Sequence, residues 1–256
     1  MENETIQKEE QDFNITTNNT ELLKNSFKVI SNIVTETKIN ISENCLSIIA
    51  MDPANVSLIE YKLFSGDCQN WDINENIEIG INTQEVYNIL KKAKKDDQVI
   101  LQKNKDHLVI ILKGNLERKH TIPLLNTEDL QTTKTPELSF KTKVIMDSKK
   151  FSDIIKEFKD FETLNLKTTE EEINFKVDTD LNKIEIAIKK EETEINTEEN
   201  ALCKYSIEYL NKVIESFKIS QMVKIEYNTD HPLSLLYEVM DTQYLRFILA
   251  HRVTDD

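Results

Sequence analysis

The chain has 256 residues, 39% of them hydrophobic and 30% charged, and its 46 acidic residues outnumber 32 basic ones to give a net charge of −14. This composition predicts a folded chain of one large or two modest domains, and it excludes a protein that coats nucleic acid or anionic membrane with its whole surface. Only three glycines occur, so no segment can supply the glycine-rich phosphate loop of a nucleotide-dependent enzyme.

The first ten residues, MENETIQKEE, are acidic and polar and do not resemble a secretion signal. No run of about 18 apolar residues follows them. Cys45, Cys68 and Cys203 are far apart and odd in number, which predicts neither a disulfide framework nor a zinc site. We therefore expect an acidic extension over residues 1–10, a reducing compartment and no membrane partner.

The elements predicted for the first half are two one-faced helices with strands between them. A helix is predicted over 20–34 because its apolar residues recur every three or four positions, and Thr20 is suited to cap it. Segments 38–42 and 77–82 alternate apolar and polar residues, which is typical of half-buried strands. A second helix of the same design is predicted over 83–95.

The second half repeats this order, with helices predicted over 148–161 and 207–218 and alternating strands over 173–177 and 183–190. Helices with one apolar stripe must bury it against a sheet. The sequence therefore predicts an α+β fold in which each half has two amphipathic helices packed on two antiparallel sheets.

The two halves are related by an internal repeat. Segment 99–112 (VILQKNKDHLVIIL) aligns with segment 223–236 (VKIEYNTDHPLSLL) at an offset of 124 residues. The offset pairs Asn104 with Asn228, Asp106 with Asp230, His107 with His231, Phe27 with Phe151 and Ile30 with Ile154. A tandem duplication is indicated. It predicts a first domain over 11–125, a polar connector over 126–137 and a second domain over 138–256.

Positive charge is concentrated on the predicted helices, which hold 12 lysines and 7 acidic residues, a net charge of +5. The rest of the chain therefore carries −19. If the helices share one side of the sheets, their lysines form a positive surface suited to phosphate backbones. The alternative is that the lysines only solvate exposed helix faces. With three arginines in the chain and no aromatic residue among these lysines, we expect contact with duplex DNA that is independent of base sequence.

A signature lies between two predicted strands, where residues 50–56 read AMDPANV. Further matches are IPLL at 122–125, DHPL at 230–233 and Leu249-Ala250 shortly before the end. From about Asp12 to Val253 the chain resembles the sliding-clamp family, proliferating cell nuclear antigen, and its archaeal members most. The resemblance implies a ring of three subunits whose helices line a hole around duplex DNA and whose outer surface tethers DNA polymerase.

The resemblance also implies how the ring closes. An edge strand over 116–124 would pair with a neighbour's strand over 183–190, in which Ile184, Ile186 and Ile188 alternate with charged or small residues. The alternative is an ordinary sheet edge protected by lysines. Homotrimer and heterotrimer both remain open at this point.

The DNA-facing positions implied by the resemblance are all lysines. They are Lys24, Lys91 and Lys156, with Lys28, Lys92, Lys95, Lys149, Lys150 and Lys212 nearby. Ser31, Asn88 and Glu215 stand where the family usually has basic residues, so we expect a hole that is less positive than usual.

The resemblance further implies a groove that accepts short apolar motifs of DNA polymerase, clamp loader, flap nuclease and ligase. Its residues would be Met51, Asn55, Val56, Leu130, Pro232, Phe247, Ile248, Ala250 and His251. An adaptable methionine and small apolar side chains suit varied partners. His251 replaces the usual proline, and the alternative for Met51 and Val56 is plain core packing.

An enzyme is the competing class. The carboxylate runs lie between predicted strands and read as solvated loops, while His107 and His231 each precede a strand and suit turns. No HExxH or GxSxG motif is present, so we expect no catalysis, cofactor or metal. A heterotrimer subunit, a checkpoint clamp and a viral processivity factor stay as alternatives. The location would be cytoplasmic and nucleoid-associated in an archaeon, and nuclear in a eukaryote.

Overall fold

The computed structural model describes residues 12–179 and 182–253, which contain eighteen strands, four α-helices and three 3-10 turns. The first half holds β1 (Phe13–Thr17), α1 (Thr20–Ile33), β2 (Glu36–Ile41), β3 (Cys45–Met51), β4 (Ser57–Phe64), η1 (Ser65–Asp67), β5 (Asn70–Ile73), β6 (Ile77–Asn82), α2 (Thr83–Leu90), β7 (Gln98–Asn104), β8 (His107–Lys113) and β9 (Glu117–Pro123). The second half holds η2 (Thr127–Asp129), β10 (Thr142–Asp147), α3 (Ser148–Glu157), β11 (Thr163–Thr168), β12 (Glu172–Asp178), β13 (Lys183–Lys189), β14 (Glu194–Thr197), β15 (Ala201–Ser206), α4 (Ile207–Val213), η3 (Ile214–Lys218), β16 (Met222–Tyr227), β17 (Leu233–Val239) and β18 (Gln243–Leu249).

The strands form three antiparallel sheets, not two sheets in each half. A five-stranded sheet has the order β5-β1-β7-β8-β9, and a four-stranded sheet has the order β13-β12-β11-β15. Between them a nine-stranded sheet runs β14-β10-β16-β17-β18-β4-β3-β2-β6. This sheet passes from one half of the chain to the other where β18 pairs with β4, so main-chain hydrogen bonds join the two halves.

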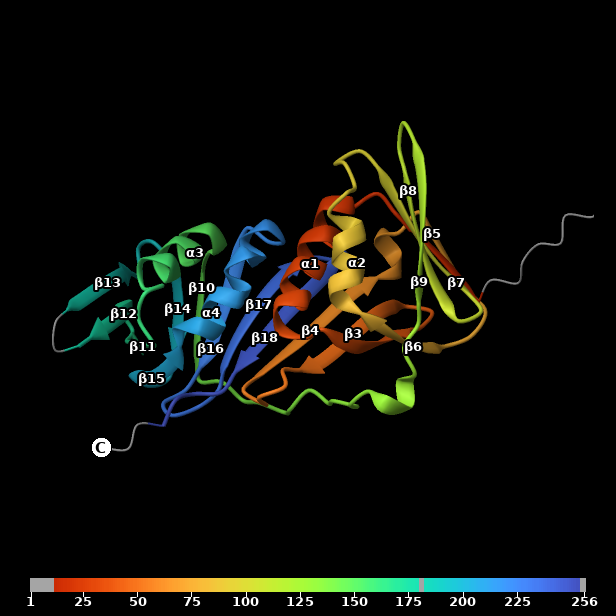
Figure 1. Ribbon diagram of the computed structural model, residues 1–256. Helices are drawn as coiled ribbons and strands as arrows, with labels where there is room; N and C mark the ends of the chain where they lie inside the picture. Colours follow the sequence, from red (N-terminus) through yellow and green to blue (C-terminus); the bar gives the residue numbers. More distant parts are fainter. Residues whose placement is uncertain (1–11, 180–181, 254–256) are drawn as a thin grey trace, which may run out of the picture.

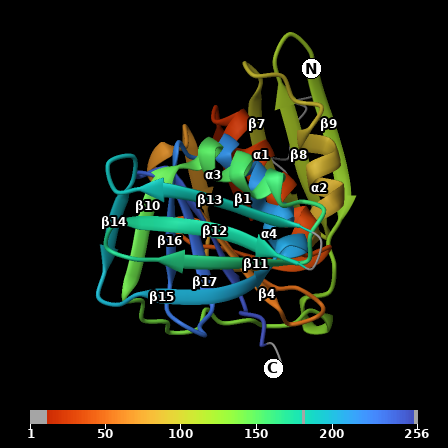
Figure 2. The same ribbon diagram turned by 90° about the vertical axis from the view of Figure 1, so that its left-hand side faces the viewer.

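The four helices lie side by side on one side of the sheets (Figure 1). Helix α1 contacts α2 on one side and α4 with η3 on the other, and α3 contacts α4 and η3. The view turned by 90° shows the same layer, with the four-stranded sheet in front of it (Figure 2). The apolar stripes of the helices face a core of buried residues, as the helical spacing predicts. The α+β fold with two helices in each half is confirmed.

Three helices are shorter than the sequence predicts. Helix α2 ends at Leu90 because the amides of Lys92 and Ala93 bond three residues back and the amide of Lys94 donates to Asp97 Oδ2 at 3.0 Å, which turns the chain. Helix α3 ends at Glu157, and α4 gives way to η3 after Val213. The expected cap is also wrong, since the N-cap residue of α1 is Asn19.

The duplication is visible in the elements, but its offset is not constant. The bounds of β5 and β14 differ by 124 residues, as do those of β6 and β15. Helix α1 starts at Thr20 and α3 at Ser148, however, which is an offset of 128. The Thr20 hydroxyl donates to the carbonyl of Asp97, just before β7, and the Ser148 hydroxyl donates to the carbonyl of Ser220, just before β16. The two residues therefore hold equivalent places in their halves. The expected pairs Phe27 with Phe151 and Ile30 with Ile154 are therefore misaligned by about one helical turn.

The stretch expected to be the connector contains the 3-10 turn η2 and neither a strand nor an α-helix. Its start is held against β6, where the amide of Leu125 donates to the carbonyl of Gly80 at 2.9 Å. A Cβ at Gly80 would lie 2.6 Å from that Leu125 carbonyl oxygen and 2.9 Å from Leu130 Cδ1. Glycine is thus required for this close approach. The acidic extension 1–10 lies outside the described residues.

Candidate nucleic-acid interface and partner groove

The lysines expected to face DNA fall into two groups. Six lie on the helix layer: Lys24 and Lys28 on α1, Lys149, Lys150 and Lys156 on α3, and Lys212 on α4. The other three, Lys91, Lys92 and Lys95, follow the end of α2 and belong to an exposed turn. The helices and η3 hold seven lysines and six acidic residues, a balance of +1 where +5 was expected. The helix layer is nearly neutral.

Each of the six helix lysines has a carboxylate partner. The pairs are Lys24 with Glu21, Lys28 with Glu215, Lys149 and Lys156 with Asp153, Lys150 with Glu192, and Lys212 with Glu208. Such partly exposed pairs contribute only about 0–1 kcal/mol each, so a phosphate can compete for the same lysines. The local carboxylates nevertheless weaken the attraction of the layer for DNA.

Glu215 connects the helices of the two halves. Its Oε2 lies 3.2 Å from Lys28 Nζ, and Lys218 contacts the same oxygen. The hydrogen bond from Lys218, with that from Lys28, holds the pKa of Glu215 below its usual range against the opposing effect of burial. Asn32 Nδ2 adds a bond of 3.0 Å to the carbonyl of Lys212. The position that lacks a basic residue thus serves the contact between α1 and η3.

Aromatic rings lie among the lysines, which corrects the expectation that none does. Lys212 Nζ lies 4.1 Å from the ring centroid of Tyr209, and Lys149 and Lys156 each lie 5.4 Å from that of Phe217. Both rings are half-buried. They hold the lysine side chains over the helix layer by cation–π contact.

The signature loop is organised by one buried carboxylate. Asp52 is 3% exposed, and it accepts hydrogen bonds from the amide of Val56 at 2.8 Å, that of Ala54 at 3.1 Å and the Tyr209 hydroxyl at 2.9 Å, besides the amide of Ser57. Burial raises the pKa of Asp52, but these hydrogen bonds outweigh it and hold that pKa below its usual range. Because Tyr209 lies on α4, the carboxylate also ties the loop to the second half.

Four of the expected groove residues come together at one end of the central strands. Met51 pairs with Leu58, which pairs with Ile248, so the three side chains form a row across β3, β4 and β18. The amide of Ala250 donates to the carbonyl of Val56 at 2.9 Å, which places these two residues beside the row. This arrangement forms an apolar strip on the face of the sheet opposite the helices.

Other expected residues lie around the strip. Pro232 precedes Leu233, which pairs with Leu249, so it sits at the same end of the sheet. His251 is half-buried just after β18, while Asn55 is exposed at the loop tip with a φ of 57°, a conformation that asparagine tolerates. Leu130 packs on Gly80 of β6, at the far edge of the nine-stranded sheet.

Phe247 is the one expected groove residue that the structure excludes. Its side chain is fully buried, since successive residues of a strand face opposite sides and Ile248 takes the outer one. Leu58 and Leu138 were not among the groove residues expected from the sequence. A hollow of about 320 Å³ lies between Ile248 and the end of the connector, where Leu138 and Phe140 line it. Met51 and Leu58 flank the loop of one hairpin, so the pairing of the two strands on either side of the loop could have indicated Leu58.

Comparison with known proteins agrees with this geometry. Residues 13–132 match proliferating cell nuclear antigen, N-terminal domain, and residues 134–252 match proliferating cell nuclear antigen, C-terminal domain. The chain belongs to the proliferating cell nuclear antigen family. The resemblance stated from the sequence is therefore confirmed.

Relatives within the family cover nearly the whole chain. A DNA polymerase sliding clamp of Thermococcus gammatolerans is 30% identical over 230 residues, which span 88% of this chain and 92% of that protein. One of Nanoarchaeum equitans is 26% identical over 238 residues, or 90% and 95% of the two chains. The crystal structure of proliferating cellular nuclear antigen from Entamoeba histolytica has a TM-score of 0.89 at 18% identity and covers 95% of this chain and 100% of its own, which shows a common fold.

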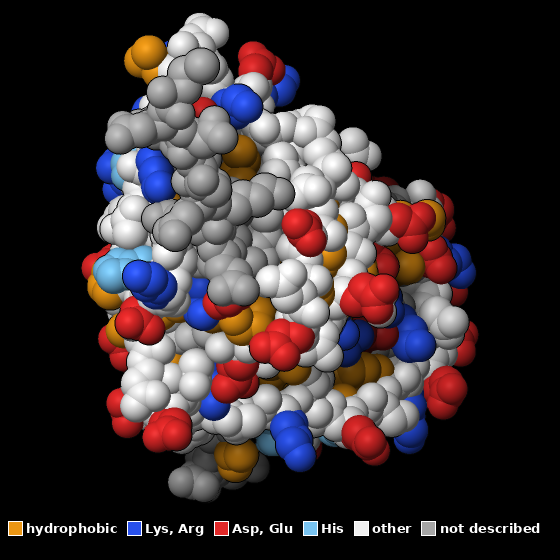
Figure 3. Space-filling view, turned by 90° about the vertical axis from the view of Figure 1, so that its right-hand side faces the viewer, with side chains coloured by type: hydrophobic (Ala, Val, Ile, Leu, Met, Phe, Trp, Pro, Cys, Tyr) orange, Lys and Arg blue, Asp and Glu red, His pale blue; other side chains and the backbone are white. Residues whose placement is uncertain are grey.

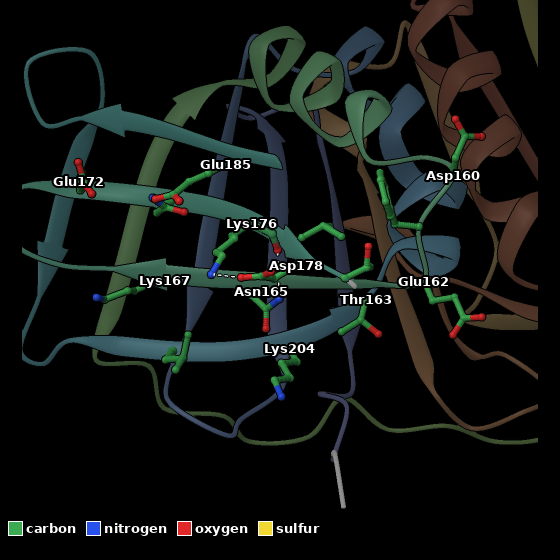
Figure 4. Close-up of a pocket in the computed structure, with 15 residues that line it drawn as sticks. Asp160, Glu162, Thr163, Asn165, Lys167, Glu172, Lys176, Asp178, Glu185 and Lys204 are labelled. Carbon is green, nitrogen blue, oxygen red and sulfur yellow. Dashed lines mark hydrogen bonds and ion pairs between the residues drawn. The ribbon is translucent and has the colours of Figure 1, made fainter. Parts of the chain in front are cut away.

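The outer face of the four-stranded sheet carries a polar hollow. Its volume is about 1000 Å³, and the side chains labelled there are Lys, Asn, Thr, Asp and Glu (Figure 4). Lys176 pairs with Asp178, and Asn174 Nδ2 donates to Glu185 at 2.7 Å, so these groups satisfy one another. Residues 12–179 and 182–253 contain no His, Cys, Asp or Glu group placed to hold a metal ion.

Another part of the surface also carries charges of both signs. Acidic and basic side chains are interspersed over the end of the molecule that the five-stranded sheet forms (Figure 3). The helices of the described residues are all too short or too polar to cross a membrane.

Proposed function

We propose that this protein is a DNA sliding clamp, in which copies of the chain form a three-subunit ring around duplex DNA. The observation that carries this proposal is the single layer formed by all four helices, on one side of a molecule whose nine-stranded sheet runs through both halves. Repeating such a two-domain unit around an axis places every helix on one wall and every groove on the other. The relatives named DNA polymerase sliding clamp support the same role.

The charge pattern favours a ring that encloses DNA over a surface that binds DNA tightly. Each phosphate that a protein neutralises adds about 0.9 to the slope of log affinity against log salt, and a steep slope accompanies strong adhesion. Here the helix lysines are held by carboxylates, and the whole chain carries −14. A ring with such a wall stays on DNA because it surrounds it, and it remains free to move along it.

The outer apolar strip provides the tether. Met51 is half-exposed and lies in an apolar row with the buried Leu58 and Ile248, beside the hollow that Leu138 and Phe140 line. A short apolar motif of a partner can insert there, in the way that small grooves capture peptides. We infer that DNA polymerase binds through this strip and that clamp loader, flap nuclease and ligase share it. The archaeal relatives make a DNA-associated location in the cytoplasm the expected one.

The test removes charge from the helix wall. Changing Lys24, Lys156 and Lys212 together to Ala is expected to reduce stimulation of a DNA polymerase on primed circular DNA several-fold, while light scattering still reports the wild-type mass. The matched control changes Lys113, Lys141 and Lys167 to Ala, since these exposed lysines lie outside the helix layer and remove the same charge. Equal stimulation by the wild type and the wall variant, or an equal loss in the control, would contradict the proposal.

A further inference from the structure

Tyr209 on α4 contacts two different surfaces of the molecule with the two ends of one side chain. Its hydroxyl donates to Asp52 Oδ2 at 2.9 Å, in the loop that follows Met51 and contains Val56. Its ring centroid lies 4.1 Å from Lys212 Nζ, on the helix layer. One half-buried side chain thus lies between the wall expected to face DNA and the groove expected to bind partners.

At the hydroxyl end, Tyr209 holds the carboxylate on which the loop depends. Asp52 Oδ1 accepts the amide of Val56 at 2.8 Å, and Oδ2 accepts the amide of Ala54 at 3.1 Å besides the hydroxyl. Apart from Tyr209, every donor to Asp52 found in the described residues belongs to segment 54–57. Tyr209 is therefore the contact that fixes this carboxylate from outside the loop.

The loop in turn places two residues of the groove. The amide of Asp52 donates to the carbonyl of Ser57 at 2.9 Å and closes the turn directly after Met51. The carbonyl of Val56 accepts the amide of Ala250 at 2.9 Å, which joins the loop to the segment after β18. A rotation of the Asp52 carboxylate would therefore move Met51 and Val56, because the loop amides follow their acceptor.

The hydrogen bond between Tyr209 and Asp52 joins a neutral donor to a charged acceptor. Burial, and after it the bond to Asp52, raises the pKa of Tyr209 to about 12, so the hydroxyl keeps its proton at neutral pH. Burial raises the pKa of Asp52, but its hydrogen bonds outweigh this and keep that pKa below its usual range, so the carboxylate is charged. Hydrogen bonds to an ionised acceptor are stronger than those between neutral groups.

At the ring end, Lys212 is held loosely. Its carboxylate partner Glu208 lies 3.8 Å away and has a side chain that is 80% exposed, so this ion pair is weak. The cation over the ring draws electron density from it and strengthens the hydroxyl as a donor, since linked ionic and hydrogen-bonding groups polarise one another. A phosphate that draws Lys212 away from the ring would therefore weaken the bond to Asp52.

We propose that Tyr209 is a positioning residue of the partner groove, which acts on Met51 and Val56 through Asp52 and makes them respond to DNA at Lys212. The inference rests on the proposed function, because it needs a wall that meets DNA and a groove that binds a partner. Coupling between two sites is reciprocal, so a partner in the groove changes the affinity of the wall for DNA by the same factor.

Methyl NMR spectra test the positioning without any partner. Tyr209→Phe keeps the ring and removes only the hydroxyl, and it is expected to shift the methyl signals of Met51 and Val56. The matched control is Tyr61→Phe, which removes a hydroxyl whose hydrogen bond to Gln243 Oε1 has the same length, 2.9 Å, at the far end of the joint between β4 and β18. This control should leave both methyl signals in place.

Binding of the DNA polymerase that the wild type stimulates gives a second readout. Calorimetric titration with this polymerase, in the absence of DNA, should show a dissociation constant that is raised ~3-fold or more in Tyr209→Phe and unchanged in Tyr61→Phe. A hydroxyl that only stabilised the fold would lower the melting temperature and leave this constant unchanged.

A short blunt-ended DNA duplex at low salt, where phosphate contacts are strongest, tests the response to DNA. In the wild type it should shift the amide signal of Lys212 and the methyl signals of Met51 and Val56 together. In Tyr209→Phe it should shift the Lys212 amide alone, because the ring still carries the lysine but no longer bonds to Asp52.

The outcomes separate this inference from the proposed function. Unshifted methyl signals or an unchanged polymerase affinity in Tyr209→Phe, or equal changes in Tyr61→Phe, overturn the positioning role. A duplex that moves the Lys212 amide of the wild type but neither methyl signal overturns the response to DNA. A wild type that binds neither the polymerase nor the duplex overturns the clamp, whereas the methyl signals of Tyr209→Phe still decide whether the hydroxyl positions the loop.

Discussion

The joint between the two domains, where β18 pairs with β4, differs in burial from β9 and β13, which end the five-stranded and the four-stranded sheet. Phe247, Ile59 and Tyr61 at the joint are fully buried, whereas His120 and Ile184 at the edges are half-buried. The joint is apolar because it is always covered. The edges carry charged and polar residues, which protect an unpaired strand from unwanted association. Incomplete burial at an edge thus marks where a neighbour belongs.

The joint also contains a buried polar network that the edges lack. The Tyr61 hydroxyl donates to Gln243 Oε1 at 2.9 Å, and Gln243 Nε2 donates to Ser26 Oγ at 3.2 Å. The network links β4, β18 and α1, so it fixes how the two halves meet.

The largest expected effect is a difference in stability loss between a buried residue of the joint and a half-buried residue of an edge strand. Phe247→Ala should lower the free energy of unfolding by about 3–5 kcal/mol, because it opens a cavity in a fully buried site. The change His120→Ala on the edge strand β9 should cost less than about 1 kcal/mol in the separated subunit, since this side chain is only half-buried there. Urea unfolding at dilutions where the subunits are separate measures both. Equal losses at the two sites would refute the difference in burial.

The next effect concerns the loop at the end of the joint. Asp52→Ala should cost about 2–3 kcal/mol, because hydrogen bonds to a charged group are among the stronger ones and the amides of Val56 and Ser57 lose their acceptor. Asp72→Ala, on the exposed side of β5, is the matched control and should be close to neutral. An unchanged stability of the Asp52 variant would show that the loop does not depend on this carboxylate.

The same carboxylate predicts a pH dependence. Since the folded state lowers the pKa of Asp52, its stabilisation is fully present above the unfolded pKa of about 3.9 and is lost as the pH falls through the folded value. The stability difference between the wild type and Asp52→Asn should therefore be largest near neutral pH and shrink below about pH 4. A difference that is constant or grows with acidity would contradict this.

A smaller effect is expected across the two halves. Tyr209→Phe removes the hydroxyl that reaches Asp52 from α4 and should cost about 1 kcal/mol, the usual contribution of one hydrogen bond. Tyr87→Phe on α2 is the control, as no hydrogen bond of its hydroxyl is found in the described residues. Calorimetry should show a lower melting temperature only for the first variant.

The smallest effect concerns the outer ion pair. Arg246→Gln should change subunit stability by less than about 1 kcal/mol, because Glu60 lies 3.9 Å away and keeps a hydrogen bond of 2.6 Å from the Tyr244 hydroxyl. A larger loss for Arg246→Gln would show that the joint depends on charge more than on burial.

Much of the fold could be predicted from the sequence, because helix stripes and strand alternation are local patterns. The starts of α1, α2, α3 and α4, the repeat and the place of the AMDPANV segment between two strands were all predicted from these patterns. Helix ends could not be predicted in the same way. The end of α2 depends on Asp97, which binds the amide of Lys94 from a later turn.

The candidate site was predicted less completely than the fold. Met51, Val56, Ile248 and Ala250 were named correctly as neighbours, but the face of a strand depends on its register, so Phe247 was placed on the wrong side. The near neutrality of the helix layer was also missed, because the predicted helices were too long. Lysines after α2 were counted as helical, although the chain has already turned away there.

The central claim is that the protein surrounds DNA, and retention on closed DNA tests it most directly. The protein, loaded on a nicked circular plasmid by a clamp loader, should stay bound through gel filtration at a salt concentration that screens charge contacts. Cutting the circle once with a restriction enzyme should then release it, since a ring slides off a free end. Release from the intact circle at that salt, or equal retention on circular and linear DNA, would contradict enclosure.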